Sequence, residues 1–188
     1  MSLLRVPVTR DDHIQGSLTS PVIMVEYGDY ECSFCGLAHP IVKRLKKHFD
    51  KELSLVFRHF PLATAHPHAQ GAAETAEFAG AHLLFWQMHD GLFANQANLG
   101  LPLYFALTTA LKLPADELRT ALETGLYAPK VRSDFIGGAR SGVNGTPSFF
   151  INGRRHDGSY EFQDLAQAID LALIEAKASP SPSKLVMN

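Results

Sequence analysis

The sequence predicts an α/β fold in which a β-α-β unit and a β-β-α unit are separated by an all-helical insertion. An apolar, β-branched segment is followed by an amphipathic helical pattern and a second apolar segment, which together indicate a βαβ unit. The middle of the chain carries helical patterns and no convincing strand pattern. Near the end, an Asn-Gly pair joins two short strand patterns. With 188 residues, the chain has room for one domain with a large insertion.

The first unit comprises two predicted strands and one predicted helix. Residues 21–30 (PVIMVEYGDY) are apolar and β-branched, which is typical of a buried strand. In residues 33–49 the apolar side chains recur at helical spacing with Lys and Arg between them, so we expect an amphipathic helix that Pro40 kinks. Residues 52–62 (ELSLVFRHFPL) predict a second strand that stops at Pro61.

The rest of the chain predicts further helices and a hairpin. Helical patterns in the insertion fall at residues 70–93, 101–111, 115–124 and 129–141. Two strands at residues 148–151 and 154–156 should form a hairpin, because Asn152-Gly153 is the strongest two-residue hairpin signal. Residues 160–177 predict an amphipathic helix, whose apolar stripe is Phe162, Leu165, Ile169, Leu171, Leu173 and Ile174.

These elements divide the chain into five consecutive parts. The parts are an N-terminal extension (1–20), the βαβ half (21–62), the helical insertion (63–142), the ββα half (143–177) and a C-terminal tail (178–188). Pro and Ser alternate in the tail, which is therefore predicted to be disordered.

Composition and charge argue against several classes of protein. A formal net charge of −2 and a pI near 6.5 provide no basic footprint for nucleic acid and no polybasic patch for a membrane surface. No stretch reaches the roughly 18 apolar residues that a membrane span needs, so no membrane insertion is expected. Residues 1–21 lack the apolar core and cleavage site of a signal peptide, which predicts a cytoplasmic protein unless a leader has been removed.

Both cysteines of the chain lie three positions apart, in the segment YECSFC at residues 30–35. The segment is placed where the first predicted strand hands over to the first predicted helix. A thiol at a helix N-terminus faces unsatisfied N–H groups and the positive end of the helix dipole, which favour the thiolate. A second thiol one turn further along can attack a mixed disulfide formed at the first. We therefore predict Cys32 as the nucleophile and Cys35 as the resolving thiol.

The sequence leaves other roles for the cysteine pair open. The main alternative is a non-enzymatic zinc-binding module that uses both cysteines and two histidines, with His59, His66 and His68 as candidates. Zinc needs four ligands, and neither a second cysteine pair nor a finger-like histidine spacing is present. A structural disulfide would close so short a loop that it would add little stability, and the spacing could also be coincidence.

Two segments together resemble the DsbA-like branch of the thioredoxin superfamily. They are VEYGDYECSFCGLAHPIVKRL and, much later, SGVNGTPSFFINGRRHDGSY, and similar domains are fused to some bacterial sodium/proton antiporters. The resemblance extends over residues 11–177, including the helical insertion. It implies a thioredoxin fold and a thiol-disulfide oxidoreductase without metal or organic cofactor. Expected partners are protein or peptide thiols and disulfides, glutathione as a small-thiol alternative, and a redox partner protein.

The resemblance also implies roles for residues outside the cysteine pair. Pro147 falls where the family has a cis-proline loop beside the cysteines, and the loop backbone could pair with an extended substrate peptide. Thr146 would then lie against the sulfurs and tune their reactivity. Glu26 matches a buried acid that relays a proton to or from Cys35. The alternatives are an ordinary turn proline at Pro147 and an outward-facing strand residue at Glu26.

In the family, the dipeptide between the cysteines helps to set the redox potential. Ser33 and Phe34 carry no positive charge, so helix dipole and backbone N–H groups should provide most of the thiolate stabilisation. Acidic side chains upstream, such as Asp29 and Glu31, would raise the thiol pKa if they were close. Oxidation, reduction and isomerisation of disulfides all remain open, and the lack of an export signal favours reduction or redox sensing.

The histidines allow two interpretations. His59, His66 and His68 follow the second predicted strand, and any of them could add positive potential to Cys32 or serve as an ordinary loop residue. His82 and His89 share one helical face with three aromatic residues, a pattern that indicates core packing rather than a cofactor site.

Overall fold

The computed structural model describes residues 2–178. Its strands are β1 His13–Gln15, β2 Val22–Gly28, β3 Leu53–His59, β4 Ser148–Ile151 and β5 Arg154–His156. Its α-helices are α1 Ser33–Phe49, α2 Ala69–Ala81, α3 Phe85–Ala94, α4 Leu101–Ala110, α5 Ala115–Thr124, α6 Ala128–Arg140 and α7 Phe162–Ala178. Two 3₁₀ turns, η1 Asp50–Glu52 and η2 Gln96–Asn98, follow α1 and α3.

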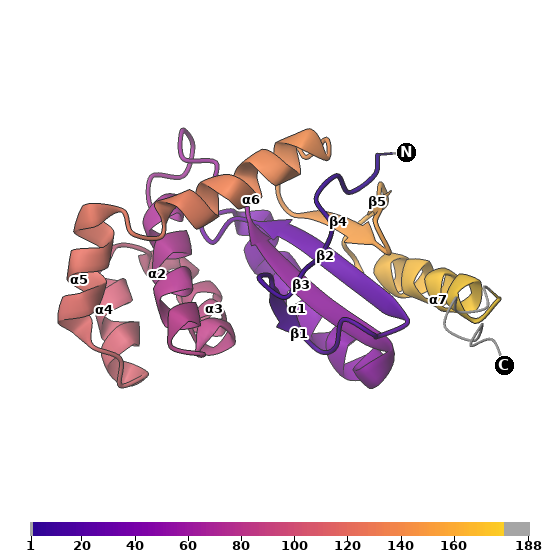
Figure 1. Ribbon diagram of the computed structural model, residues 1–188, viewed down its shortest axis with the longest axis horizontal. Helices are drawn as coiled ribbons and strands as arrows, with labels where there is room; N and C mark the ends of the chain where they lie inside the picture. The colour runs from indigo at the N-terminus through magenta and orange to yellow at the C-terminus, as the bar shows by residue number, and fades with distance from the viewer. Residues whose placement is uncertain (1, 179–188) are drawn as a thin grey trace, which may run out of the picture.

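The strands form one mixed sheet with the order β1-β3-β2-β4-β5 (Figure 1). β2 and β3 are parallel and are joined through α1, whereas β4 is antiparallel to β2, and β5 to β4. This arrangement confirms the predicted β-α-β and β-β-α units. The Asn-Gly hairpin also has the predicted strand bounds, and Asn152 adopts a positive φ of 46° at its turn.

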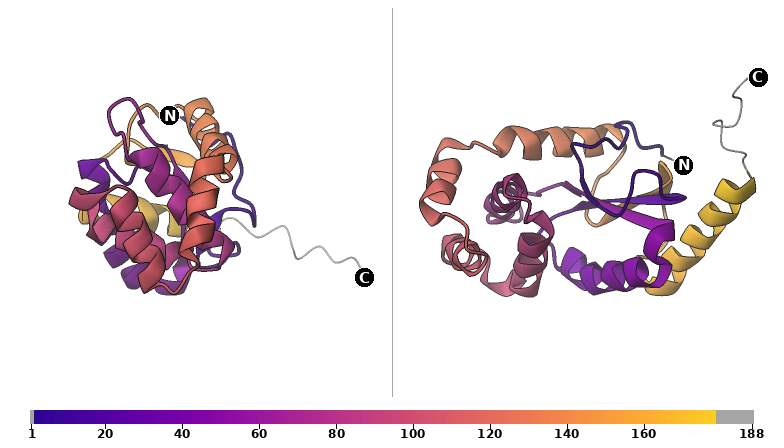
Figure 2. Two further views of the ribbon diagram at one scale, coloured as in Figure 1. Left: turned by 90° about the vertical axis from the view of Figure 1, so that its left-hand side faces the viewer. Right: turned by 60° about the horizontal axis from the view of Figure 1, so that its bottom comes forward.

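Helices cover both faces of the sheet (Figure 2). α1 and α7 pack together on one face, and α6 lies against β3 on the other. Helices α2 to α5 extend from one end of the sheet, so the insertion forms a separate layer whose core meets the sheet at Tyr30 and Phe57 (Figure 1). The cysteines belong to this same core, and the active-site candidates therefore lie where sheet and insertion meet.

The period-2 alternation of β2 decides which side chains face α1. Val22 and Met24 pack in the core beneath α1 and α7, whereas Val25 and Tyr27 pack in the core beneath α6. Glu26 has the parity of Met24, so it points to the α1 side of the sheet, although it lies in an otherwise apolar strand.

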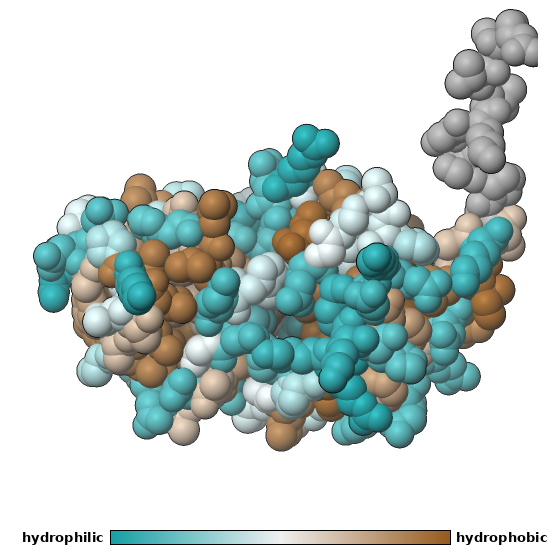
Figure 3. Space-filling model, turned by 90° about the horizontal axis from the view of Figure 1, so that it is seen from below, coloured by the Kyte–Doolittle hydropathy of each residue, from teal (hydrophilic) through white to brown (hydrophobic). Residues whose placement is uncertain are grey.

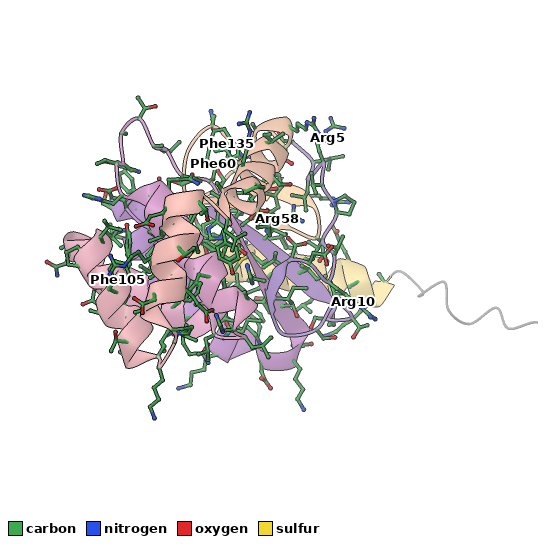
Figure 4. All side chains as sticks on the ribbon, turned by 60° about the vertical axis from the view of Figure 1, so that its left-hand side comes forward. Arg5, Arg10, Arg58, Phe60, Phe105 and Phe135 are labelled. Atoms are coloured by element: carbon green, nitrogen blue, oxygen red, sulfur yellow. The ribbon has the colours of Figure 1, made fainter. Side chains whose placement is uncertain are left out.

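The predicted N-terminal extension is part of the sheet, which corrects the expectation for residues 1–20. β1 pairs antiparallel with β3, and Leu3 bridges to Arg154 at the opposite edge. Arg58 of β3 holds this segment: its guanidinium lies 2.7 Å from Asp12 and donates to the carbonyl of Val6 at 2.9 Å (Figure 4). The sequence did not indicate β1, because three residues are too few to establish a period.

Two helix predictions also need correction. The pattern at residues 70–93 is two helices, because Leu83 takes the left-handed conformation (φ 63°) between α2 and α3. In α7, Leu171 and Ile174 are 57% and 64% exposed, so they do not belong to the buried stripe. The predicted disorder of the tail falls on residues 178–188, of which all but the first lie outside the described residues.

The surface differs between the two ends of the molecule. Seen from below, hydrophobic side chains gather over the insertion, while the face over α1 is mostly hydrophilic (Figure 3). Leu101 and Leu126 are among the exposed apolar residues of the insertion. Within residues 2–178, none of the helices combines the length and apolar character that crossing a bilayer requires.

Candidate active site

The two cysteines lie at the start of α1, as the sequence predicts. Cys32 is the N-cap residue, and its carbonyl accepts the N–H of Gly36 at 3.1 Å. Cys35 is in the first turn and is fully buried, whereas Cys32 retains slight exposure. Both are free thiols. The pair therefore presents one accessible sulfur, with the second sulfur shielded behind it.

The two thiols differ strongly in acidity. The pKa of Cys32 is lowered to about 5, chiefly because the Cys35 side chain donates a hydrogen bond to its sulfur; burial opposes the shift. Thr146 and the backbone N–H groups of Phe34 and Cys35 contribute further. The expectation that the helix dipole and backbone donors dominate is wrong in this respect. Burial, the hydrogen bond to Cys32 and the charge of Glu26 raise the pKa of Cys35.

The loop before β4 reaches the sulfur of Cys32 from the other half of the fold. The Thr146–Pro147 peptide bond is cis. Cys32 Sγ lies 3.3 Å from the Thr146 carbonyl oxygen, a contact between residues 114 positions apart. The hydroxyl Oγ1 of Thr146 is buried and has no other partner within the described part of the chain. The structure thus brings Cys32 together with the Thr146–Pro147 loop, which lie in the two segments that resemble the DsbA-like branch.

Glu26 is buried beneath the cysteines. It is 3% exposed, and its Oε1 has no hydrogen-bond partner among residues 2–178. Burial raises its pKa to about 8. Its charge is also one cause of the raised pKa of Cys35, which places it close to that sulfur. The alternative of an outward-facing strand residue is therefore wrong, and Glu26 can hold a proton at neutral pH.

The dipeptide between the cysteines is exposed. Ser33 and Phe34 both face outward, and Phe34 is 57% exposed beside the similarly exposed Leu37. These two apolar side chains form a rim next to Cys32. Phe34 is predicted to help set the redox potential, and its position also suits contact with an apolar group of a substrate.

Sequence reasoning missed a residue that positions the cysteine segment. Gln96, in η2, donates from Nε2 to the carbonyl oxygens of Tyr30 at 2.7 Å and Cys32 at 2.8 Å. A Cβ at Gly36 would meet the side-chain amide of Gln96, so a larger residue there would push Gln96 away from these hydrogen bonds. A glutamine in a 3₁₀ turn carries no sequence signal for this role, since its partners are backbone atoms.

Asp29 lies close to the cysteines but has its own hydrogen-bond partners. Its carboxylate accepts the N–H groups of Glu31 and Leu62, both at 2.8 Å, and lies 2.7 Å from His66 Nδ1. Burial opposes the charged form of His66, but the hydrogen bond to Asp29 and the nearby Cys32 thiolate raise its pKa above the ordinary value. His66 is therefore the histidine that adds positive potential near Cys32.

The other histidines have structural surroundings. His59 is buried against Glu77. His68 is exposed, and its backbone N–H donates a hydrogen bond to the Glu31 carboxylate. His89 is buried in the aromatic core and lies 3.0 Å from the Tyr30 hydroxyl, which agrees with the packing interpretation, whereas His82 is exposed.

The alternative zinc site does not form. Within residues 2–178, the side chains that could share a metal ion form two clusters, neither of which includes a cysteine. One contains His13, His59 and Glu77, and the other His39, His89 and Asp90. The cysteine site itself combines an acidic thiol at Cys32, a thiol of raised pKa at Cys35 and a buried acid at Glu26.

Comparison with known proteins places the chain in a family. The thioredoxin family model matches residues 8–171. Among curated proteins, 178 residues are 43% identical to a protein of Salinispora arenicola named Na(+)/H(+) antiporter NhaA 1. A protein of Salinispora tropica named Na(+)/H(+) antiporter NhaA 3 is 40% identical over 178 residues. The matched region covers 94% of this chain but only 27% of each relative.

Solved structures with the same fold include BdbD and alpha-DsbA1. Oxidised BdbD from Bacillus subtilis superposes with a TM-score of 0.83 at 20% identity, over 92% of this chain and 98% of that one. The alpha-DsbA1 protein of Wolbachia pipientis gives a TM-score of 0.80 at 22% identity, over 93% and 96% of the two chains. At these identities the likeness concerns the fold.

Proposed function

This chain belongs to the thioredoxin family, and we propose that it is a DsbA-like thiol-disulfide oxidoreductase with Cys32 as its nucleophile. The observation that carries the proposal is the difference between the two thiols. Cys32 has a pKa of about 5 and is accessible, while the pKa of the buried Cys35 is raised. At neutral pH one sulfur is a thiolate and the other keeps its proton, as a nucleophile and a resolving thiol require.

Oxidation of substrate dithiols is the direction that this acidity supports. A substrate thiolate attacks Cys32 in the Cys32–Cys35 disulfide, the S–S bond breaks, and Cys35 leaves as a thiolate. Glu26, protonated at neutral pH, gives its proton to Cys35. A second substrate thiolate then attacks the mixed disulfide at the substrate sulfur, and Cys32 leaves as a stable thiolate. Both substrate sulfurs are oxidised, and both cysteines end reduced.

The low pKa of Cys32 supports an oxidising potential. Stabilising the thiolate stabilises the reduced protein and so raises the reduction potential. Compared with a thiol of ordinary pKa, a pKa of about 5 at Cys32 raises the potential by roughly 60 mV at pH 7. A cytoplasmic location, expected from the first residues, would instead favour net reduction, and that location stays a prediction.

Protein or peptide thiols suit the surroundings of Cys32 better than glutathione does. An extended peptide could align with the Thr146 backbone while an apolar side chain packs on Phe34 and Leu37. A separate redox protein would then re-oxidise the dithiol, docking on the same face.

The test is exchange between the oxidised protein and a reduced peptide dithiol. Cys32→Ser should lower the exchange rate at least about a thousandfold, because it removes the attacked sulfur. Cys35→Ser cannot form the internal disulfide, so it is mixed with the oxidised peptide instead: its Cys32 thiolate should open the peptide disulfide, releasing one peptide thiol, and the mixed disulfide should accumulate at Cys32, visible by mass spectrometry. Full exchange by Cys32→Ser would contradict the proposal, and a measured reduction potential near that of thioredoxin would contradict the oxidising direction.

A further inference from the structure

Three side chains from three separate elements converge at a point that shares no residue with the cysteine site. They are His13 of β1, His59 of β3 and Glu77 of α2. The Nε2 atoms of both histidines lie 2.8 Å from the same oxygen, Glu77 Oε1. All three potential ligand atoms are within 4.8 Å of one another. Two imidazole nitrogens therefore converge on one carboxylate oxygen.

The surroundings hold these side chains in place. The ring of His13 stacks on Phe85, with 3.5 Å between centroids and 5° between planes. Gly80 makes room for this ring, since a Cβ there would lie 2.8 Å from His13 Cε1. His59 is 1% exposed and the Glu77 side chain 8%, so neither can swing into solvent without opening the core. Such preorganised donors lower the entropic cost of taking up a ligand.

The two histidines are the basic partners of this carboxylate. Within residues 2–178, no Lys or Arg forms a salt bridge with Glu77, whereas His13 and His59 both contact it. The donors at this point are therefore two imidazoles and one carboxylate, with no lysine or arginine side chain that a divalent cation would have to displace.

We propose that His13, His59 and Glu77 bind one divalent transition-metal ion, with zinc as the best match to the donors. Zinc takes imidazole nitrogen and carboxylate oxygen in tetrahedral sites, and three protein ligands leave one position for water. Magnesium and calcium prefer all-oxygen sites, so this donor set disfavours them. Bound metal would link β1 to β3 and α2, and it would fasten the N-terminal segment to the insertion.

The second cluster offers a matched comparison. His39, His89 and Asp90 also come within ligand distance of one another. However, Lys43 lies 2.6 Å from Asp90, so a cation already neutralises that carboxylate. His89 Nδ1 is also engaged, by the Tyr30 hydroxyl. A metal ion at this cluster would have to displace Lys43 from Asp90 and Tyr30 from His89, so we expect it to stay empty.

The experiment is zinc titration of the full chain carrying Cys32→Ser and Cys35→Ser, which removes thiol binding. Calorimetry after EDTA treatment and dialysis should give one zinc per chain, with a Kd below about 10 µM. Cobalt should bind the same site with the visible spectrum of a tetrahedral ion. His13→Gln, at the partly exposed ligand, should weaken zinc binding at least about tenfold.

Controls separate this site from others. His39→Gln should leave the affinity and the stoichiometry unchanged, and calcium should give no heat of binding. Glu77→Gln should abolish binding; if that variant does not fold, His13→Gln, which removes only one contact near the surface, decides the question. Absence of stoichiometric zinc in the cysteine-free protein would overturn the proposal. Zinc binding that survives His13→Gln but is lost in His39→Gln would do so too.

Discussion

Two buried glutamates, Glu26 and Glu77, have pKa values shifted in opposite directions. Oε1 of Glu26 on β2 has no hydrogen-bond partner in the described part of the chain, and burial raises the pKa of this group to about 8. Glu77 on α2 is almost as buried, but hydrogen bonds from His13 and His59 keep its pKa low. Both carboxyl groups leave water, and only one is met by hydrogen-bond donors. The comparison teaches that partners, rather than burial alone, decide whether a buried acid carries charge.

The difference has a chemical consequence. The unpartnered acid keeps its proton at neutral pH beside a thiol that must gain and lose one, so it suits proton transfer. The partnered acid keeps its charge between two imidazoles, so it suits structural pairing or a cation. Three predictions test this difference between the buried carboxyl groups.

The largest effect expected concerns the pH dependence of stability at Glu26. In the unfolded chain this group ionises near 4.5, and in the folded protein at about 8, so between these values only the unfolded state gives up its proton. Stability conferred by the neutral form is complete at low pH and is lost as the pH rises towards 8. Relative to Glu26→Gln, the wild type should lose about 3 kcal/mol of unfolding free energy between about pH 5 and pH 8.

Urea unfolding of the oxidised proteins would measure this loss, because the disulfide removes the titration of the cysteines. Parallel stability curves for the wild type and Glu26→Gln would show that Glu26 ionises normally. That outcome would also remove it as the proton carrier.

The second prediction concerns Glu77. Glu77→Gln replaces a charged acceptor of two hydrogen bonds by a neutral amide, and we expect a loss of about 2 kcal/mol in unfolding free energy, measured in EDTA at pH 7. Glu74→Gln is the control, because it lies one turn earlier on α2, is equally buried, and has Oε2 unpartnered within the described chain. It should cost less than half as much. Equal losses in the two variants would mean that the histidine contacts add nothing.

The smallest effect concerns Asp29, a third buried carboxylate. Its hydrogen bond raises the pKa of His66, and the charged His66 in turn affects the pKa of Cys32. His66→Gln removes a positive charge near Cys32, so the pKa of the Cys32 thiol should rise. The midpoint of alkylation rate against pH should move up by about half a pH unit. His68→Gln, an exposed neighbour, should leave the midpoint in place. An unchanged midpoint in His66→Gln would assign the acidity of Cys32 to Cys35 and backbone donors alone.

Much of the fold was predictable, because the signals were local. The bounds of α5 and of the β4–β5 hairpin match the predicted ones, since a helix start at Pro114 and an Asn-Gly turn depend on adjacent residues. The short strand β1 was missed, and so was the break at Leu83, because a left-handed leucine has no sequence signature. β1 exists through its pairing with β3, a contact between segments about 40 positions apart.

The candidate site divides in the same way. From its residues alone, the chain predicted a dithiol at a helix start; its resemblance to the DsbA-like branch added the Thr146–Pro147 loop as the partner of the cysteines and Glu26 as a buried acid. Only the tertiary structure decided which groups acquired partners. Glu77 meets His13 across 64 positions, while Glu26 meets no donor for Oε1 within residues 2–178. The reason is physical: spacing along a chain encodes local geometry, whereas charge and acidity depend on desolvation and contacts that exist only after the elements have packed.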